Sequence, residues 1–361
     1  MLQYFSHFRY TFLLPHYHLF VIPCLILISC AKTANNGNSV PPHDSTSVTN
    51  IYIAGDNGTN PILWKNGIAD TLSSTIGSAS QVIVSGSDVY VSGFYQGIQD
   101  TNSSGNPTPP SMGQYTYWKN GIPNNIGGFG NITYLSFISV AGDDIYFANS
   151  SGWKNGSIII QGMSIVQSCF ASGNDIYFVG SDSVNDAVYW KNGNLNIVSP
   201  FRGRGFTTPH ADRIYVSGND VYVGGMMDQA VYWKNGVVHF LQPRTTDSSF
   251  VSTISSIFVS GNDVYTTGYI IPIFAPPGVN IGPAYWKNGI EHDLSVNAPF
   301  DFNTSYGTSS IFVIGSDVYV AGYSLTLVSP ALPYAHSAIY WKNGAETVLS
   351  ASGIANSIYV Q

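Results

Sequence analysis

The chain has 361 residues, of which 44% are hydrophobic, 14% aromatic and only 9% charged, and it contains 37 glycines. This composition excludes a disordered chain, which needs low hydrophobicity and high net charge, and a collagen-like chain, which needs glycine at every third position. With 13 Lys and Arg against 20 Asp and Glu, the net charge of −7 argues against a protein that binds nucleic acid through its phosphates.

The first 29 residues predict a signal peptide. An apolar stretch from Leu19 to Ile28 leads into Leu27-Ile28-Ser29-Cys30, which resembles the bacterial lipoprotein box where the peptide is cut before a cysteine that receives a diacylglyceryl group. Pro15 and Pro23 flank or interrupt this stretch, which makes it a poor membrane-spanning helix. An ordinary secretory peptide or an uncleaved anchor is the alternative. We expect residues 1–29 to be removed and Cys30 to be lipidated.

Residues 30–49 are rich in Asn, Ser, Thr and Pro, and they predict a flexible tether between the lipid and the folded domain. The tetrapeptide Ala31-Lys32-Thr33-Ala34 contains neither the aspartate nor the acidic run that other lipoproteins use as sorting signals. By that resemblance we expect an envelope protein anchored by lipid in the outer membrane and facing the periplasm, with surface exposure as the alternative. Cys169 is then the one thiol left without a lipid in the mature chain, and its apolar surroundings predict a buried structural residue.

Two short motifs alternate over residues 50–361. The first, Trp-Lys-Asn-Gly, uses every tryptophan in the chain and begins at Trp64, Trp118, Trp153, Trp190, Trp233, Trp286 and Trp341. The second, Gly-X-Asp-(Val/Ile)-Tyr, begins at Gly86, Gly142, Gly173, Gly218, Gly261 and Gly315, and Asn50-Ile51-Tyr52 is a degenerate seventh copy. Seven units share this region at about 45 residues each, which is the size of a β-propeller blade.

Residues 254–294 serve as a template for one blade of four strands. We expect strands a to d at Ile257–Ser260, Val264–Thr267, Ala284–Trp286 and Ile290–Leu294. Gly261-Asn262 suits a type II′ turn between a and b, and Asn288-Gly289 suits a type I′ turn between c and d. Strands a and b are apolar on both faces, as in blades stacked around an axis, whereas a sandwich would alternate.

The two ends of the repeat region predict how the ring closes. Residues 51–55 match strand b, and Ser357–Val360 match strand a, so the first blade is assembled from both ends of residues 50–361. This closure removes the exposed edge that an open array of blades would present. We therefore predict an all-β, seven-bladed β-propeller of four-stranded blades.

In this repeat pattern the sequence resembles β-propeller proteins of the kelch and WD kinds. It is more closely similar to exported bacterial lipoproteins that carry Tyr-Trp-Lys-Asn-Gly repeats. It lacks the Gly-His and Trp-Asp signatures of WD repeats, and it has Trp-Lys-Asn-Gly where kelch repeats have their own motif. The resemblance therefore implies an architecture and transfers no binding residues.

The repeated charges predict cross-strand pairs, because an Asp that opens strand b lies near the Lys that closes strand c. The expected pairs are Asp88/Lys119, Asp144/Lys154, Asp175/Lys191, Asp220/Lys234, Asp263/Lys287 and Asp317/Lys342. The alternative is a multivalent lectin with one Trp-Lys-Asn-Gly site per blade, in which Trp stacks on a sugar while Lys and Asn donate hydrogen bonds. No unit clusters the oxygen ligands that a metal such as calcium requires, so we expect no metal and no cofactor.

The connections between strands differ between the two ends of the propeller. The a–b and c–d turns are short, whereas the b–c and d–a connections at the other end vary in length, which favours a binding role there. Residues 200–213 and 242–253 contain four of the five Lys and Arg residues that lie outside the motifs in the mature chain. The expected ligand contacts in them are Arg202, Arg204, His210, Arg213, Arg244 and Asp247. An acidic glycan or an acidic protein fits this set, and ordinary solvated loops are the alternative.

Catalysis requires an acid, base or nucleophile at a non-repeated position. The available residues are His210, Asp212, His239, Glu291, His292 and Asp301, and none has a diagnostic spacing. We therefore expect a non-catalytic binding or scaffold lipoprotein of the bacterial envelope, monomeric and attached to the membrane by its lipid alone. A propeller hydrolase or lyase acting on glycans is the alternative.

Overall fold

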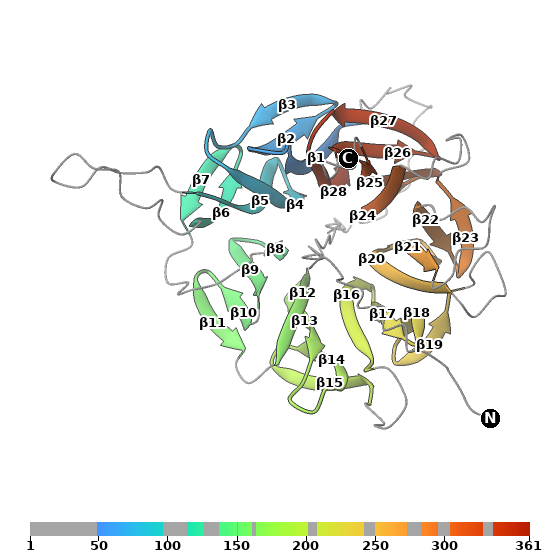
Figure 1. Cartoon of the computed structure of the whole chain (residues 1–361). Coiled ribbons are helices and arrows are strands. Elements are labelled where there is room, and N and C mark those ends of the chain that lie inside the picture. Colours follow the sequence, from blue (N-terminus) through green and yellow to red (C-terminus); the bar gives the residue numbers. More distant parts are fainter. Residues whose placement is uncertain are drawn as a thin grey trace, which may run out of the picture.

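The computed structural model describes residues 49–96, 114–125, 137–149, 151–160, 164–200, 208–241, 250–272, 283–294, 304–327 and 335–361. These residues form 28 strands and no helix, and the strands make seven four-stranded antiparallel sheets arranged in a ring (Figure 1). The predicted seven-bladed β-propeller is confirmed. Residues 1–48, with the expected signal peptide, Cys30 and nearly all of the tether, lie outside the described residues.

Each blade extends from an inner strand, next to the central channel, to an outer strand. In that order, blade 1 has β28 (Ile354–Val360), β1 (Ile51–Asp56), β2 (Pro61–Lys65) and β3 (Ile68–Thr71). Blade 2 has β4 (Gly77–Ser85), β5 (Asp88–Tyr95), β6 (Gln114–Lys119) and β7 (Ile122–Asn125). Blade 3 has β8 (Phe137–Ala141), β9 (Asp144–Asn149), β10 (Ser151–Lys154) and β11 (Ser157–Ile160).

The remaining four blades follow in chain order. Blade 4 has β12 (Ile165–Ser172), β13 (Asp175–Ser181), β14 (Ala187–Lys191) and β15 (Asn194–Ser199). Blade 5 has β16 (His210–Ser217), β17 (Asp220–Met227), β18 (Gln229–Lys234) and β19 (Val237–Phe240). Blade 6 has β20 (Phe250–Ser260), β21 (Asp263–Pro272), β22 (Pro283–Lys287) and β23 (Ile290–Asp293). Blade 7 has β24 (Thr304–Ile314), β25 (Asp317–Thr326), β26 (Ala335–Lys342) and β27 (Ala345–Ser350).

The hairpin turns follow from the residues that the two motifs place in them. Asn288 and Gly289 have φ angles of 52° and 83°, as both central residues of a type I′ turn require. Gly261 has a φ of 59°, whereas its neighbour Asn262 does not have a positive φ, which agrees with the predicted type II′ turn. These two-residue turns fix the register of each hairpin, with Ser260 opposite Asp263 and Lys287 opposite Ile290 in blade 6.

The ring is closed by the pairing of β28 with β1, which the two ends of the repeat region predicted. Ile358 lies opposite Ile53, and both side chains are buried. Beyond the strands, the Asn50 amide donates to the Gln361 carbonyl at 2.6 Å, and the Gln361 amide donates to the Asn50 carbonyl at 3.0 Å. Residues more than 300 positions apart in the sequence thus form one blade.

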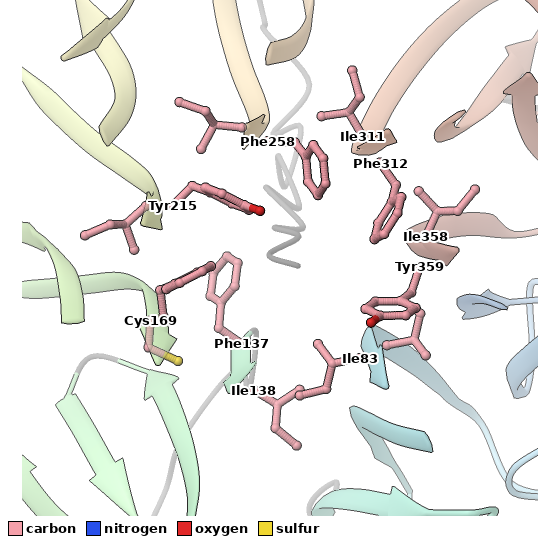
Figure 2. Packing of buried hydrophobic residues seen from close by; sticks show 14 of the residues in the cluster. Ile83, Phe137, Ile138, Cys169, Tyr215, Phe258, Ile311, Phe312, Ile358 and Tyr359 are labelled. Atoms are coloured by element: carbon pink, nitrogen blue, oxygen red, sulfur yellow. The ribbon is translucent and has the colours of Figure 1, made fainter. Parts of the chain in front are cut away.

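Aromatic side chains from the inner strands surround the centre of the ring (Figure 2). Phe170, Tyr215, Phe258, Phe312 and Tyr359 come from the same position in five successive inner strands, and consecutive ring centroids lie 4.8–5.2 Å apart. The seven tryptophans are also buried. Large buried aromatic surfaces make the dominant contribution to the stability of such a core.

The inner strand of each blade would otherwise expose one unpaired edge inside the protein. Polar side chains from the preceding blade satisfy several of these backbone groups. The amide of Val82 donates to Ser357 Oγ at 3.0 Å, and the amide of Ile358 donates to Ser310 Oγ at 3.1 Å. The amide of Ile138 donates in the same way to Gln81 Oε1 at 2.7 Å. These bonds join neighbouring blades and remove the cost of burying unpaired amides.

Candidate functional site

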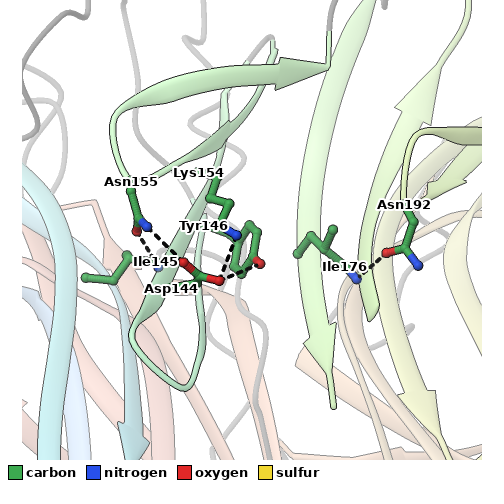
Figure 3. A network of polar contacts seen from close by, with 7 residues as sticks. All are labelled: Asp144, Ile145, Tyr146, Lys154, Asn155, Ile176 and Asn192. Atoms are coloured by element: carbon green, nitrogen blue, oxygen red, sulfur yellow. Dashed lines mark hydrogen bonds and ion pairs between the residues drawn. The ribbon is translucent and has the colours of Figure 1, made fainter. Parts of the chain in front are cut away.

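One end of the propeller carries a repeated polar cluster, which blade 3 shows in detail (Figure 3). Lys154 Nζ lies 2.7 Å from Asp144 Oδ2, and Asn155 Nδ2 donates to Asp144 Oδ1 at 2.9 Å. Asn155 Oδ1 accepts a hydrogen bond from the Ile145 amide at 2.9 Å, and the Tyr146 hydroxyl donates to Asp144 Oδ2 at 3.5 Å. We call this cluster the clasp, and the end of the propeller that carries it the clasp face.

The clasp recurs in six blades, and all six predicted ion pairs are confirmed. The Lys Nζ to Asp Oδ2 distances are 2.7–2.8 Å in every pair, from Asp88/Lys119 to Asp317/Lys342. The hydrogen bond from the paired lysine holds the pKa of each aspartate below its ordinary value. In blade 1, Asn50 replaces the aspartate and accepts from Asn66 Nδ2 at 3.1 Å, while Lys65 lies over the Tyr52 ring.

These contacts bear on the lectin alternative. In six blades the Lys and Asn side chains of the motif bind the Asp of their own blade, and the tryptophans that would stack on a sugar are buried. The described structure therefore assigns the Trp-Lys-Asn-Gly motif to turn formation, cross-strand pairing and packing.

The opposite end of the channel is shaped by β-bulges in the inner strands. In six blades one extra residue interrupts the pairing of the inner strand with its neighbour. The extra residues are Ser80, Gln167, Asp212, Ser255, Ser309 and Asn356. All six are polar, and a bulge commonly re-aims a side chain next to a functional site. We call this set the bulge ring.

A glycine opposite each bulge makes room for it. Gly55, Gly93, Gly180, Gly225, Gly268 and Gly322 each stand five positions after the Asp of the a–b turn, or after Asn50 in blade 1, and each pairs with the residue just before the bulge. A Cβ on Gly225 would lie 1.8 Å from the His210 carbonyl oxygen, and one on Gly180 would lie 2.0 Å from that of Ile165. In blade 3 Asn149 holds this position. This recurring glycine was missed at the level of sequence, and it is the signal that predicts the bulge ring.

Hydrogen bonds hold parts of the bulge ring in place. Asn356 Nδ2 donates to the Ala79 carbonyl at 2.8 Å and to Ser78 Oγ at 3.0 Å, and Ser78 Oγ donates to Asp56 Oδ2 at 2.7 Å. Burial raises the pKa of Asp56 above its ordinary value, and the hydrogen bonds from Ser78 and Gly58 offset part of this rise. On the other side, Ser255 Oγ lies 3.2 Å from Thr308 Oγ1. These bonds hold Asn356, Ser255 and Thr308 in buried positions between neighbouring blades.

Blade 5 brings charge to this mouth. His210 is exposed at the start of β16, Asp212 is partly buried at the bulge, and Arg213 is fully buried. Arg213 Nε donates to the Ser255 carbonyl at 2.5 Å, and its Nη1 donates to the Asp212 carbonyl at 2.8 Å. Burial raises the pKa of Asp212, and the charges of Arg213 and His210 oppose that change.

Arg213 also reaches beyond its own blade. Its guanidinium carbon lies 5.2 Å from the centre of the Phe137 ring, which belongs to the inner strand of blade 3. Arg213 and Phe137 both stand five residues before the glycine of the a–b turn, so they share one depth in the channel, two blades apart. Stacked on this ring, the guanidinium group forms part of the floor beneath the bulge ring.

The structure describes two of the six predicted ligand contacts. His210 and Arg213 both lie in β16, whereas Arg202, Arg204, Arg244 and Asp247 lie outside the described residues. The expectation that Arg213 belongs to the connection of residues 200–213 is wrong, because β16 begins at His210 and the Arg213 side chain is buried. A role in ligand contact stays a prediction for all six.

Three other catalytic candidates lie in the outer strands of their blades. His239 and His292 are in the outer strands β19 and β23, where they stack on Tyr232 and Tyr285 with ring centroids 4.7 and 4.6 Å apart. Glu291 is also in β23, and Asp301 lies outside the described residues. Among the described residues no three His, Cys, Asp or Glu side chains come together as metal ligands. In that same part of the chain no helix has the length and apolarity that crossing a bilayer requires.

No protein-family model matches the chain, and no curated protein sequence matches it. Among solved structures the chain is similar to apo AztD from Citrobacter koseri, with 10% identity and a TM-score of 0.37 over 87% of this chain and 97% of that one. It is also similar to a GH43 endo-arabinanase from Bacillus licheniformis, with 10% identity and a TM-score of 0.31 over 74% of this chain and 95% of that one. We transfer no activity and no ligand from either protein.

Proposed function

We propose that this chain is a non-catalytic binding lipoprotein of the bacterial envelope, which holds a glycan or protein ligand at the bulge-ring end of its channel. The bulge ring is the observation that carries the proposal. In six blades a polar residue stands at the bulge of the inner strand, at the same strand position and at the end of the propeller opposite the clasp face. Convergent polar groups above an apolar floor are typical of ligand sites.

The charge near this mouth favours an acidic ligand. Arg213 is part of the floor, His210 is exposed beside it, and Arg202, Arg204 and Arg244 belong to the connections that precede β16 and β20 in the sequence. Guanidinium groups bind carboxylate and sulfate groups through paired hydrogen bonds. An acidic polysaccharide or an acidic protein segment therefore fits better than a neutral sugar.

A binding screen with matched variants tests this proposal. The wild-type chain and the variant Arg202→Ala/Arg204→Ala/Arg244→Ala are compared on a glycan array and in pull-down experiments from envelope extracts. The variant should lose at least about tenfold in affinity for an acidic ligand, and wild-type binding should weaken as salt rises. The control variant Asn174→Ala/Asn262→Ala changes two exposed turns of the clasp face and should bind normally. Equal binding and equal salt dependence in all three proteins would refute the proposal that these arginines contact an acidic ligand.

A glycan hydrolase or lyase is the second candidate, and the raised pKa of Asp212 beside His210 is the observation that favours it. Catalysis predicts that Asp212→Asn abolishes turnover of a glycan while binding survives. A binding protein predicts instead graded losses of affinity spread over several mouth residues.

The proposed location has its own test. Mass spectrometry of the membrane fraction should find a diacylglyceryl group on Cys30 as the first residue of the mature chain. Recovery of a soluble protein with an unmodified Cys30 would contradict the lipid anchor and leave the ligand site untouched.

A further inference from the structure

The described chain starts and ends at the clasp face. Asn50 stands where the other blades have the Asp of their a–b turn, and its backbone is bonded to that of Gln361. From there β1 runs to Asp56, which lies opposite Ile354 at the bulge-ring end. The tether that precedes Asn50 is therefore joined to the propeller on the side opposite the proposed ligand site.

The length of the tether limits how the propeller can sit on a bilayer. Residues 30–49 are 20 positions, and a flexible segment of that length has an end-to-end distance of about 25 Å. The seven residues of β13 (Asp175–Ser181), which run from one end of blade 4 toward the other, span about 23 Å. A lipid on Cys30 would thus hold the clasp face near the membrane, and turning the propeller over would stretch the tether.

The chemistry of the clasp face suits a neutral lipid surface. In each of its six ion pairs, the positive charge of the Lys cancels the negative charge of the Asp. Beside these pairs, the residue that follows the Asn-Gly turn is an exposed aliphatic side chain in four blades: Ile68, Ile122, Val237 and Ile290 are 76%, 67%, 62% and 60% exposed. Because the four occupy the same position in their blades, they lie at one level around the axis. A flat surface can contact all of them together.

We propose that the clasp face lies against the lipid bilayer and that the bulge ring points away from it. The four aliphatic residues, which we call the rim, then rest at the boundary between headgroups and acyl chains. This orientation depends on the lipid anchor of the proposed function. In this orientation the proposed ligand site faces away from the membrane, and the bilayer is the binding partner of the clasp face.

Fluorescence quenching by labelled lipids tests the orientation. Asn174→Cys and Val184→Cys place one thiol at each end of β13, and both positions are exposed. Cys169 is buried and adds no background label. The lipidated chain carries an environment-sensitive dye in phosphatidylcholine vesicles that contain a nitroxide lipid. We expect the dye at position 174 to be quenched at least about threefold more than the dye at position 184. Equal quenching, or stronger quenching at position 184, would overturn the orientation.

The same experiment separates a failed anchor from a failed orientation. If Cys30 is unmodified, the lipid-anchor proposal fails, and the two labelled proteins are instead attached through a histidine tag at residue 30 to vesicles that contain a nickel-chelating lipid. The difference between positions 174 and 184 then still decides whether the clasp face prefers the bilayer. Binding to glycans is measured separately and does not depend on either result.

The rim is tested by a multiple substitution with a matched control. Ile68→Ser/Ile122→Ser/Val237→Ser/Ile290→Ser should reduce the quenching difference to less than half of its wild-type value without lowering the melting temperature, because these side chains are exposed. The control Ile76→Ser/Val348→Ser changes exposed aliphatic residues outside the rim and should keep the difference. If the rim is instead an interface between copies, the Cys30→Ser chain will dimerise in analytical ultracentrifugation and the rim variant will not. That outcome would overturn the assignment to lipid.

Discussion

Replacing Ile358 by alanine tests how firmly β28 closes the ring. Ile358 is fully buried in β28, which packs against β4, β24 and β25 besides pairing with β1. Truncating such a residue removes its transfer free energy and leaves a cavity, so the free energy of unfolding should fall by about 2–5 kcal/mol. With an unfolding entropy near 2.1 cal/mol/K for each of about 312 residues, the melting temperature should fall by about 3–8 °C.

Two further variants serve as references for the loss of stability in Ile358→Ala. Ile257→Ala truncates the residue at the same position in β20, which the chain continues on both sides, and it should cost about as much. Val348→Ala truncates an exposed side chain and should cost less than about 0.5 kcal/mol. Melting of the three variants is followed by circular dichroism and by differential scanning calorimetry.

The comparison between Ile358→Ala and Ile257→Ala decides the question. If β28 stays paired in solution, the two variants lose similar stability. If β28 frays, its buried surface is not required for folding, and Ile358→Ala will melt close to the wild type while Ile257→Ala does not. That result would refute closure of the ring by the C-terminal strand. Deleting residues 357–361 extends the test and should prevent folding, because the lost burial approaches a typical total stability of about 5–15 kcal/mol.

Three other outcomes follow from the clasp and the core. Asn288→Ala should melt below Asn288→Gly in calorimetry, because a left-handed φ of 52° costs alanine about 1–2 kcal/mol more than glycine, and equal melting would contradict this. The clasp lowers the pKa of Asp263 and its counterparts, so its contribution to the free energy of unfolding is complete above the ordinary Asp pKa of 3.8 and is lost as the pH falls through the lower pKa of the folded state. Asp263→Asn should therefore flatten the dependence of the melting temperature on pH below about 4. Burial raises the pKa of the Cys169 thiol, so iodoacetamide should modify it only after unfolding. Rapid reaction in native buffer would show that Cys169 is accessible in the folded protein.

Features that depend on short separations along the chain could be predicted from the sequence. Asn-Gly and Gly-X pairs select hairpin turns, each turn sets the register of its two strands, and that register places Asp263 beside Lys287. The split blade could also be predicted, because Ser357–Val360 repeats the pattern of an inner strand. The turns and ion pairs recur in six or seven blades, and this repetition distinguishes them from chance matches.

The mouth of the channel, in contrast, is built by contacts between distant residues. The sequence places Arg213 in a connection between blades, as a ligand contact, yet its buried guanidinium group lies on Phe137, 76 positions earlier in the sequence and two blades away. The bulge ring likewise brings Asp212 and Asn356 to the same end of the propeller, although they stand 144 positions apart in the sequence. The physical reason is that hairpin register is set by neighbours along the chain, whereas the contents of the channel are set by side chains that seven separate blades direct toward a common axis.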